Sequence, residues 1–164
     1  MAINFNRSKT KIFELLPLFL LFYISLNGSS VFNLILFSIN IQYIIIYYWV
    51  LKEPEYMGYG FIFLAGVITD IVLGLPIGVT ALSLLVVAGF ASYTRFVTVR
   101  VTVVSDWISF APALIVANIF YFASLHFSEF SINYLYLFRD SFFTFLFYPV
   151  FWLLFTLILK LAKI

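Results

Sequence analysis

Apolar runs of about the length of a membrane span dominate this chain and leave few folds open to it. The chain has 164 residues and is 65% hydrophobic but only 10% charged. A soluble domain is about 25% charged, so there are too few polar residues here to cover a water-facing surface. We predict an all-α integral membrane protein in which about six transmembrane helices form one compact bundle, a single domain over residues 1–164. The predicted spans are 12–27, 33–51, 57–74, 79–94, 107–125 and 141–159.

The distribution of basic residues predicts the orientation of these spans. Six spans place both termini on the same side of the membrane, and eight of the nine Lys and Arg residues then fall on that side, with only Arg139 opposite. Basic loops face the cytoplasm, so we expect both termini to be cytoplasmic. Lys52, Arg95 and Arg100 are then cytoplasmic topology determinants, and the two arginines have a second reading as a dock for a cytoplasmic partner. Tyr47–Trp49, at the end of the second span, is predicted to be an aromatic belt at the membrane surface.

The segment 57–82 contains the strongest turn signal of the chain. Gly74, Pro76 and Gly78 follow an apolar run and precede another. Glycine adopts backbone angles closed to other residues, and proline has no amide proton to donate. We therefore expect a helix to end near Gly74 and a second helix to start at Val79, so that the two form a tight hairpin.

One face of the first helix of this hairpin is small and acidic. Gly58, Ile62, Gly66, Asp70 and Gly74 recur every four residues and so share a face. Small residues let a neighbouring helix approach closely in lipid, and polar side chains find partners across the gap. An aspartate facing lipid at a helix centre costs roughly 2.5–3.5 kcal/mol, so Asp70 should face protein.

Asp70 is the one residue in which the sequence suggests a function, and two readings stay open. An ionisable group inside a span is a functional candidate by default, as a docking site for a partner helix or a ligand contact. The structural reading is a hydrogen bond within its own bundle. Its candidate partners are Thr80 or Ser83 across the hairpin, Asn118 or Tyr121 nearby, and Arg139 at the end of the sixth span.

The residues that membrane enzymes need are sparse in this sequence. Cysteine is absent, His126 is the one histidine, and no HExxH spacing or phosphate-binding loop occurs. The predicted topology also places Asp70 and Asp106 in opposite halves of the bilayer, so they form no carboxylate pair. We expect no enzymatic activity, no catalytic, metal or cofactor-binding residues, and no nucleic-acid partner.

The order of these features resembles MreD, the family of bacterial rod-shape-determining membrane proteins. The resemblance rests on residues 47–95: an apolar run ending in Tyr-Tyr-Trp, a charged turn with proline, Gly-x-x-x-Asp, Gly-x-Pro-x-Gly and then Ala-Leu. These elements are Tyr47–Trp49, Lys52–Pro54, Gly66 with Asp70, Gly74 with Pro76 and Gly78, and Ala81–Leu82. The turn often reads GxPLG in that family, and this chain has Ile77 in place of the leucine.

The resemblance implies a multi-pass protein of the bacterial inner membrane that helps the cell-elongation machinery to build peptidoglycan and maintain rod shape. The implied partners are an MreC-like bitopic protein and, through it, MreB, a RodA-type glycan polymerase and a class B transpeptidase. On this reading the face from Gly58 to Gly74 docks a partner's transmembrane helix. The implied fold is similar to the substrate-binding components of energy-coupling-factor (ECF) vitamin transporters. The alternative function is therefore a small-molecule-binding transporter component, for which Asp70 and the polar second span are the motive.

Overall fold

The computed structural model describes residues 3–28, 39–98, 102–128 and 134–162, with the backbone alone in the outer turns of the first and last helices. Within these residues there are six α-helices, one short 3-10 turn and no β-strand, which confirms the all-α prediction. The elements are α1 (Ile3–Leu26), α2 (Ile41–Lys52), η1 (Pro54–Tyr56), α3 (Tyr59–Leu73), α4 (Val79–Val97), α5 (Val103–Phe127) and α6 (Tyr134–Ala162).

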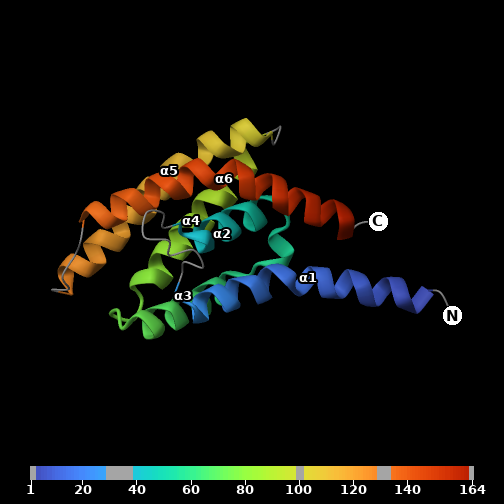
Figure 1. The fold of residues 1–164 in the computed structure, drawn as a ribbon, viewed down its shortest axis with the longest axis horizontal. Coiled ribbons are helices and arrows are strands. Elements are labelled where there is room, and N and C mark those ends of the chain that lie inside the picture. The colour runs from blue at the N-terminus through green and yellow to red at the C-terminus, as the bar shows by residue number, and fades with distance from the viewer. Residues whose placement is uncertain (1–2, 29–38, 99–101, 129–133, 163–164) are drawn as a thin grey trace.

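The helices pack in three layers, as Figure 1 shows. α1 and α3 form one outer layer, α5 and α6 form the other, and α2 and α4 lie between them. α3 contacts α4, α4 contacts α2 and α5, and α2 also contacts α1 and α6. α1 begins and α6 ends on the same side of the view, so the two outer layers start and finish at one end of the molecule.

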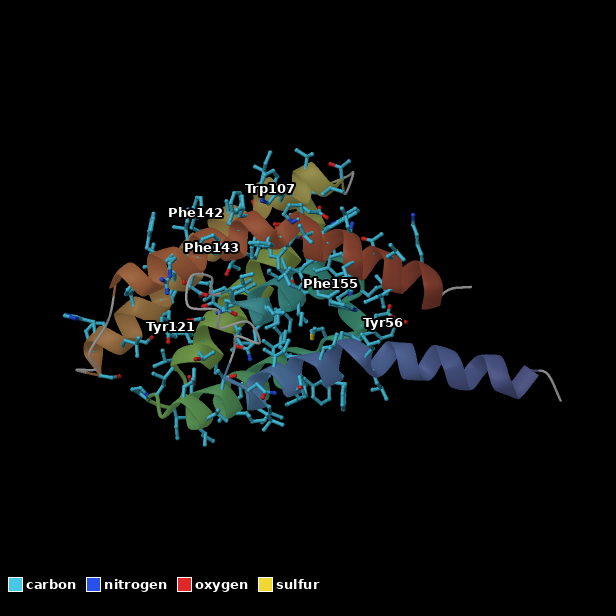
Figure 2. All side chains as sticks on the ribbon, in the orientation of Figure 1. Tyr56, Trp107, Tyr121, Phe142, Phe143 and Phe155 are labelled. Atoms are coloured by element: carbon cyan, nitrogen blue, oxygen red, sulfur yellow. The ribbon has the colours of Figure 1, made fainter. Side chains whose placement is uncertain are left out.

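Helix α2 is the centre of the core, and here the prediction of an aromatic belt is wrong. Tyr47, Tyr48 and Trp49 are each at most 1% exposed, and every residue from Ile41 to Leu51 is buried. Phe155 of α6 packs on both Tyr48 and Trp49, and Figure 2 shows it between α6 and the inner layer. The aromatic residues lie inside because α1, α4 and α6 surround α2.

Three of the helices are long and apolar enough to cross a membrane, by length and composition. They are Val79–Val97, Val103–Phe127 and the Phe138–Lys160 part of α6. α2 and α3 have 12 and 15 residues, or about 18 and 22 Å at 1.5 Å per residue, against a hydrocarbon core of about 30 Å. The predicted second and third spans, 33–51 and 57–74, are thus shorter as helices, and residues 33–38 lie outside the described part. The structure therefore shows membrane-protein-like helices, three of which have the length and composition of a span.

The turn between α3 and α4 follows the sequence prediction. Gly74 ends α3 with a φ of +65°, and Gly78 precedes α4 with a φ of +103°, both in the left-handed region that favours glycine. The backbone N–H of Leu75 donates to the Asp70 carbonyl at 2.9 Å, and the N–H of Gly74 donates to the Ile71 carbonyl at 3.3 Å. These two bonds form a Schellman motif, so the prediction that the helix ends near Gly74 and that the next begins at Val79 is confirmed.

Candidate functional site

The side chain of Asp70 closes the α3–α4 hairpin. It is 0% exposed, and its two carboxyl oxygens accept hydrogen bonds from the backbone N–H groups of Gly78 at 2.8 Å and Thr80 at 2.9 Å. Gly78 is the residue that caps α4, and the first N–H groups of a helix have no partner within the helix. Asp70 therefore satisfies the start of α4 from the end of α3, which agrees with the structural reading of a hydrogen bond to Thr80 across the hairpin.

Gly66 lies one turn before Asp70, where α3 and α4 come closest. A Cβ atom added to Gly66 would lie 2.3 Å from the Cα of Ala81 and 2.7 Å from its backbone nitrogen. Contacts this short do not occur between real atoms, so only glycine fits here without moving the helix backbones apart. The buried residues of α3 are Ile62, Ala65, Gly66, Thr69 and Asp70.

The central part of the small-residue face predicted on α3 is thus covered by α4 of the same chain. Gly58 and Gly74, at the two ends of that face, are exposed. Gly58 precedes α3 and accepts through its carbonyl from the N–H groups of Phe61 and Ile62. Pro76 lies in the turn and is partly buried, and its carbonyl accepts from the N–H of Val79. A partner helix approaching this face would meet α4 at Gly66 and Asp70.

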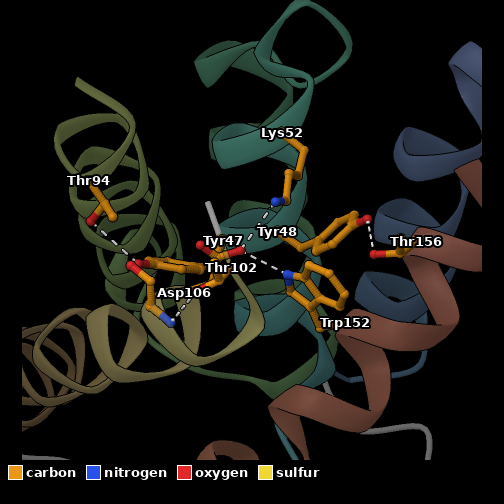
Figure 3. A network of polar contacts seen from close by, with 9 residues as sticks. Tyr47, Tyr48, Lys52, Thr94, Thr102, Asp106, Trp152 and Thr156 are labelled. Atoms are coloured by element: carbon orange, nitrogen blue, oxygen red, sulfur yellow. Dashed lines mark hydrogen bonds and ion pairs between the residues drawn. The ribbon is translucent and has the colours of Figure 1, made fainter. Parts of the chain in front are cut away.

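A second cluster, which the sequence analysis missed, joins α2, α5 and α6 through charge. We call Lys52, Asp106 and Trp152 the charge cluster. The Nζ of Lys52 is 3.4 Å from Oδ2 of Asp106, whose side chain is 1% exposed against 21% for Lys52. The indole N–H of Trp152 donates to the same oxygen at 2.8 Å, and Lys52 Nζ lies 5.2 Å from the centre of the Trp152 ring. Figure 3 shows the three side chains converging from their helices.

Tyrosine hydroxyl groups surround the charge cluster. Tyr47 donates to Thr94 of α4 at 3.4 Å, and the hydroxyls of Tyr48 and Thr156 of α6 lie 3.0 Å apart. Among the described residues, Oδ1 of Asp106 and the hydroxyl of Tyr148 have no hydrogen-bond partner. The charge cluster therefore fixes α2 against α5 and α6 at one end of the bundle, and the Tyr47 hydroxyl adds a contact with α4. Lys52, which we predicted to be a cytoplasmic topology determinant, also forms an ion pair between helices.

The sequence did carry a usable signal for this pair. In the predicted topology Lys52 ends the second span and Asp106 opens the fifth, so both lie at the cytoplasmic end. A charge that is buried in a bundle needs a partner. Two opposite charges at the same end of the bundle, each next to an apolar run, are therefore expected to form an ion pair.

We expect a double-mutant cycle to detect the ion pair. Lys52→Met keeps the apolar stem, and Asp106→Asn keeps the shape of the acceptor of Trp152. The coupling in the free energy of unfolding should be about 1 kcal/mol, because the ammonium group is partly exposed and its attraction is screened. Unfolding in mixed micelles of increasing denaturing detergent measures it. The same cycle with Lys160→Met, an exposed basic residue of α6, should give no coupling, and equal coupling in both cycles would contradict the pairing.

One of the polar side chains of the second predicted span, Gln42, connects helices within the bundle. Gln42 is fully buried, and its amide nitrogen donates to the hydroxyls of Ser25 on α1 and Thr69 on α3, each at 2.9 Å.

Arg95 is exposed in the last turn of α4, and Arg100 lies outside the described residues. His126 is exposed near the end of α5.

Both sites connect helices by hydrogen bonds and charge. In the described part of the chain, no group of three or more His, Cys, Asp or Glu side chains is placed to hold a metal ion. Comparison with known proteins found no family model, no curated protein and no solved structure that matches this chain.

Proposed function

We propose that this protein is a non-enzymatic membrane scaffold or regulator of the bacterial cell-elongation machinery, in keeping with its resemblance to MreD. The observation that supports this best is how the residues of the resemblance are used. Tyr47–Trp49 fill the core, Lys52 joins the charge cluster, Gly66 sets the α3–α4 contact, and Asp70 caps α4. These residues build a rigid helical frame, which is what a protein that positions other membrane proteins requires.

The proposal includes a place in the cell. The protein is a multi-pass protein of the bacterial inner membrane, with six spans and cytoplasmic termini, and it lies beside an MreC-like bitopic protein. Support comes from the three helices of membrane length and from the start of α1 and the end of α6 at one end of the molecule. Large apolar side chains exposed along α5 and α6 suit contact with lipid and with partner helices.

The alternative, a vitamin-binding component of an ECF-type transporter, has weaker support. Its motive was the presence of Asp70 and of polar residues in the second span. Both carboxyl oxygens of Asp70 accept from the chain's own amides, and Gln42 donates to Ser25 and Thr69. These groups hold helices together, which leaves the carboxylate of Asp70 and the amide nitrogen of Gln42 engaged within the bundle.

Affinity purification from the native host tests the proposal. In this experiment, a tag is added to the C-terminus of the protein and the membranes are solubilised in a mild detergent. The co-purifying proteins are then identified by mass spectrometry. We expect an MreC-like bitopic protein and a wall synthase, enriched at least tenfold over an unrelated tagged membrane protein of equal abundance. Recovery of paired ATPases with a membrane coupling subunit would replace the scaffold with the transporter component. Recovery of neither group, with the tagged protein intact and folded, would overturn the scaffold.

A further inference from the structure

Helix α6 contains a proline in its interior. Pro149 has no backbone N–H to donate, so the carbonyl of Phe145, four residues earlier, has no donor within the helix. A proline inside a helix also bends it, because the ring clashes with that same carbonyl. Figure 1 shows that α6 changes direction along its length. Pro149 therefore divides α6 into a first part, residues 134–148, and a second part, residues 149–162.

Trp107 of α5 donates to the carbonyl that Pro149 leaves without a helical partner. The indole N–H of Trp107 is the donor to the Phe145 carbonyl, at 2.9 Å. The rings of Trp107 and Phe145 also stack, with centroids 5.2 Å apart and planes at 23°. A backbone carbonyl without a donor is costly in a protein interior and in lipid. Trp107 therefore satisfies α6 at the point where the proline interrupts it.

Asp106, the residue before Trp107, holds α6 on the other side of the proline. Its Oδ2 accepts from the indole N–H of Trp152, three residues after Pro149, at 2.8 Å (Figure 3). We call these two hydrogen bonds, from Trp107 to Phe145 and from Trp152 to Asp106, the proline clamp. Two adjacent residues of α5 thus fix α6 before and after the proline.

The second part of α6 has one side that no other described helix covers. Val150, Leu153 and Leu157 on this side are each more than half exposed. Among residues 150–160, whose side chains the structure describes, Phe155 is the only buried one. A helix that is packed along one side only can change its angle without displacing the helices behind it. The proline clamp therefore lies where it controls that angle.

We propose that Pro149 is a hinge of α6 and that Asp106 and Trp107 hold this hinge at one angle. When the two hydrogen bonds of the proline clamp are lost, the second part of α6 swings relative to the bundle, and the first part stays in place. Lys52 is 21% exposed and pairs with Asp106, so it connects the hinge to the surface of the bundle. The proposal does not depend on the proposed role in cell elongation.

Distances between two spin labels, measured by double electron–electron resonance, test the hinge. The chain has no cysteine, so labels attach only to cysteines that are introduced. Leu64 on α3, in the opposite outer layer, is the reference position. It is paired either with Leu157, after the proline, or with Leu146, before it. All three side chains are exposed, so labels there do not disturb the core.

The Trp107→Phe/Trp152→Phe variant removes both donors of the proline clamp and keeps an aromatic ring at each position. Leu157 lies about 12 Å beyond Pro149 along the helix, so a change of about 20° in the bend moves it by about 4 Å. We expect the distance distribution between the labels at 64 and 157 to shift or broaden by about that amount. The distance between the labels at 64 and 146 should stay as in the wild type.

Pro149→Ala provides the matched control. Alanine has an N–H that can donate to the Phe145 carbonyl, so α6 is continuous and needs no donor from Trp107. In this background, removing both indole donors should change neither distance. If the variant with both replacements does not fold, Trp107→Phe or Trp152→Phe alone should give a smaller shift at position 157.

Three results would overturn the hinge. The first is an unchanged distance to position 157 in a folded variant that lacks both indole donors. The second is an equal change at position 146, which would mean that the whole of α6 has loosened. The third is a shift at position 157 that persists with Pro149→Ala, because the bending would then occur elsewhere.

Discussion

Replacing Gly66 with alanine is expected to destabilise the fold by about 3 kcal/mol or more, which is a large effect for one added methyl group. The new Cβ would lie 2.3 Å from the Cα of Ala81, and the two nearest atoms belong to the backbone of α4. A side chain could rotate away, but a backbone cannot, so α3 and α4 would have to separate along their contact. Overpacking commonly costs about 1–3 kcal/mol, and more where nothing can yield. The free energy of unfolding in mixed micelles measures the effect.

Two other glycines provide controls for this substitution. Gly60 on α3 and Gly89 on α4 both have open space where a Cβ would be added. Alanine stabilises a helix by up to about 1 kcal/mol relative to glycine, so Gly60→Ala and Gly89→Ala should be neutral or slightly stabilising. Adding Ala81→Gly to Gly66→Ala should rescue little, because the closest contacts are to the Ala81 backbone. If Gly66→Ala were as stable as Gly60→Ala, the close packing of α3 on α4 would be wrong.

The hairpin could be predicted because its signals are local. The left-handed backbone at Gly74 and Gly78 depends on the residues at those positions, and the four-residue spacing places Gly66 and Asp70 on one face. Both signals can be read within one segment of the sequence. The prediction that Asp70 faces protein is confirmed in the same way, because the cost of exposing it to lipid does not depend on the neighbouring helices.

The identity of the neighbour on each face could not be predicted from the same signals. In a membrane protein, apolar residues face lipid as well as the core, so the hydrophobic pattern does not distinguish the two directions. This is why Tyr47–Trp49 was predicted to be a surface belt although α2 is enclosed by other helices. It is also why the face containing Gly66 was left open between a partner helix and a neighbour in the same bundle, and the structure shows that α4 covers it. The charge cluster was missed because it joins segments that are distant in sequence.

The small acidic face of α3 therefore has a different meaning in the structure than in the sequence. Three features suggested a docking site: small residues, an acidic side chain, and a four-residue spacing that places them on one face. In the structure, α4 packs against the small residues of this face, and its backbone donates to the acidic side chain. A docking surface for partner proteins in the proposed function has to be sought on the exposed apolar sides of the bundle. The exposed residues of α6 include Phe138, Phe142, Leu146, Val150, Leu153, Leu154 and Leu157.

Replacing Asp70 with alanine is the second substitution for which we expect a large effect, a loss of about 2–4 kcal/mol in the free energy of unfolding. The change leaves the N–H groups of Gly78 and Thr80 without their acceptors. Thr80 is buried, and a buried N–H group without an acceptor lowers the free energy of unfolding by about 1–3 kcal/mol. Asp70→Asn keeps one acceptor oxygen and should lose roughly half as much. The same micelle unfolding experiment measures both variants.

Thr80→Val is the matched control for Asp70. It keeps the backbone N–H that Asp70 accepts and removes only a hydroxyl group, which has no hydrogen-bond partner among the described residues. Its stability should stay within about 0.5–1 kcal/mol of the wild type, since nothing is left unpaired. If Asp70→Ala were as stable as Thr80→Val but lost its co-purifying partners, Asp70 would act by contacting another protein. If Asp70→Ala loses both stability and partners, and Asp70→Asn loses about half as much of each, the effect on partners follows from the hairpin. The reason is that the cap at the start of α4 also holds the helices against which the partners dock.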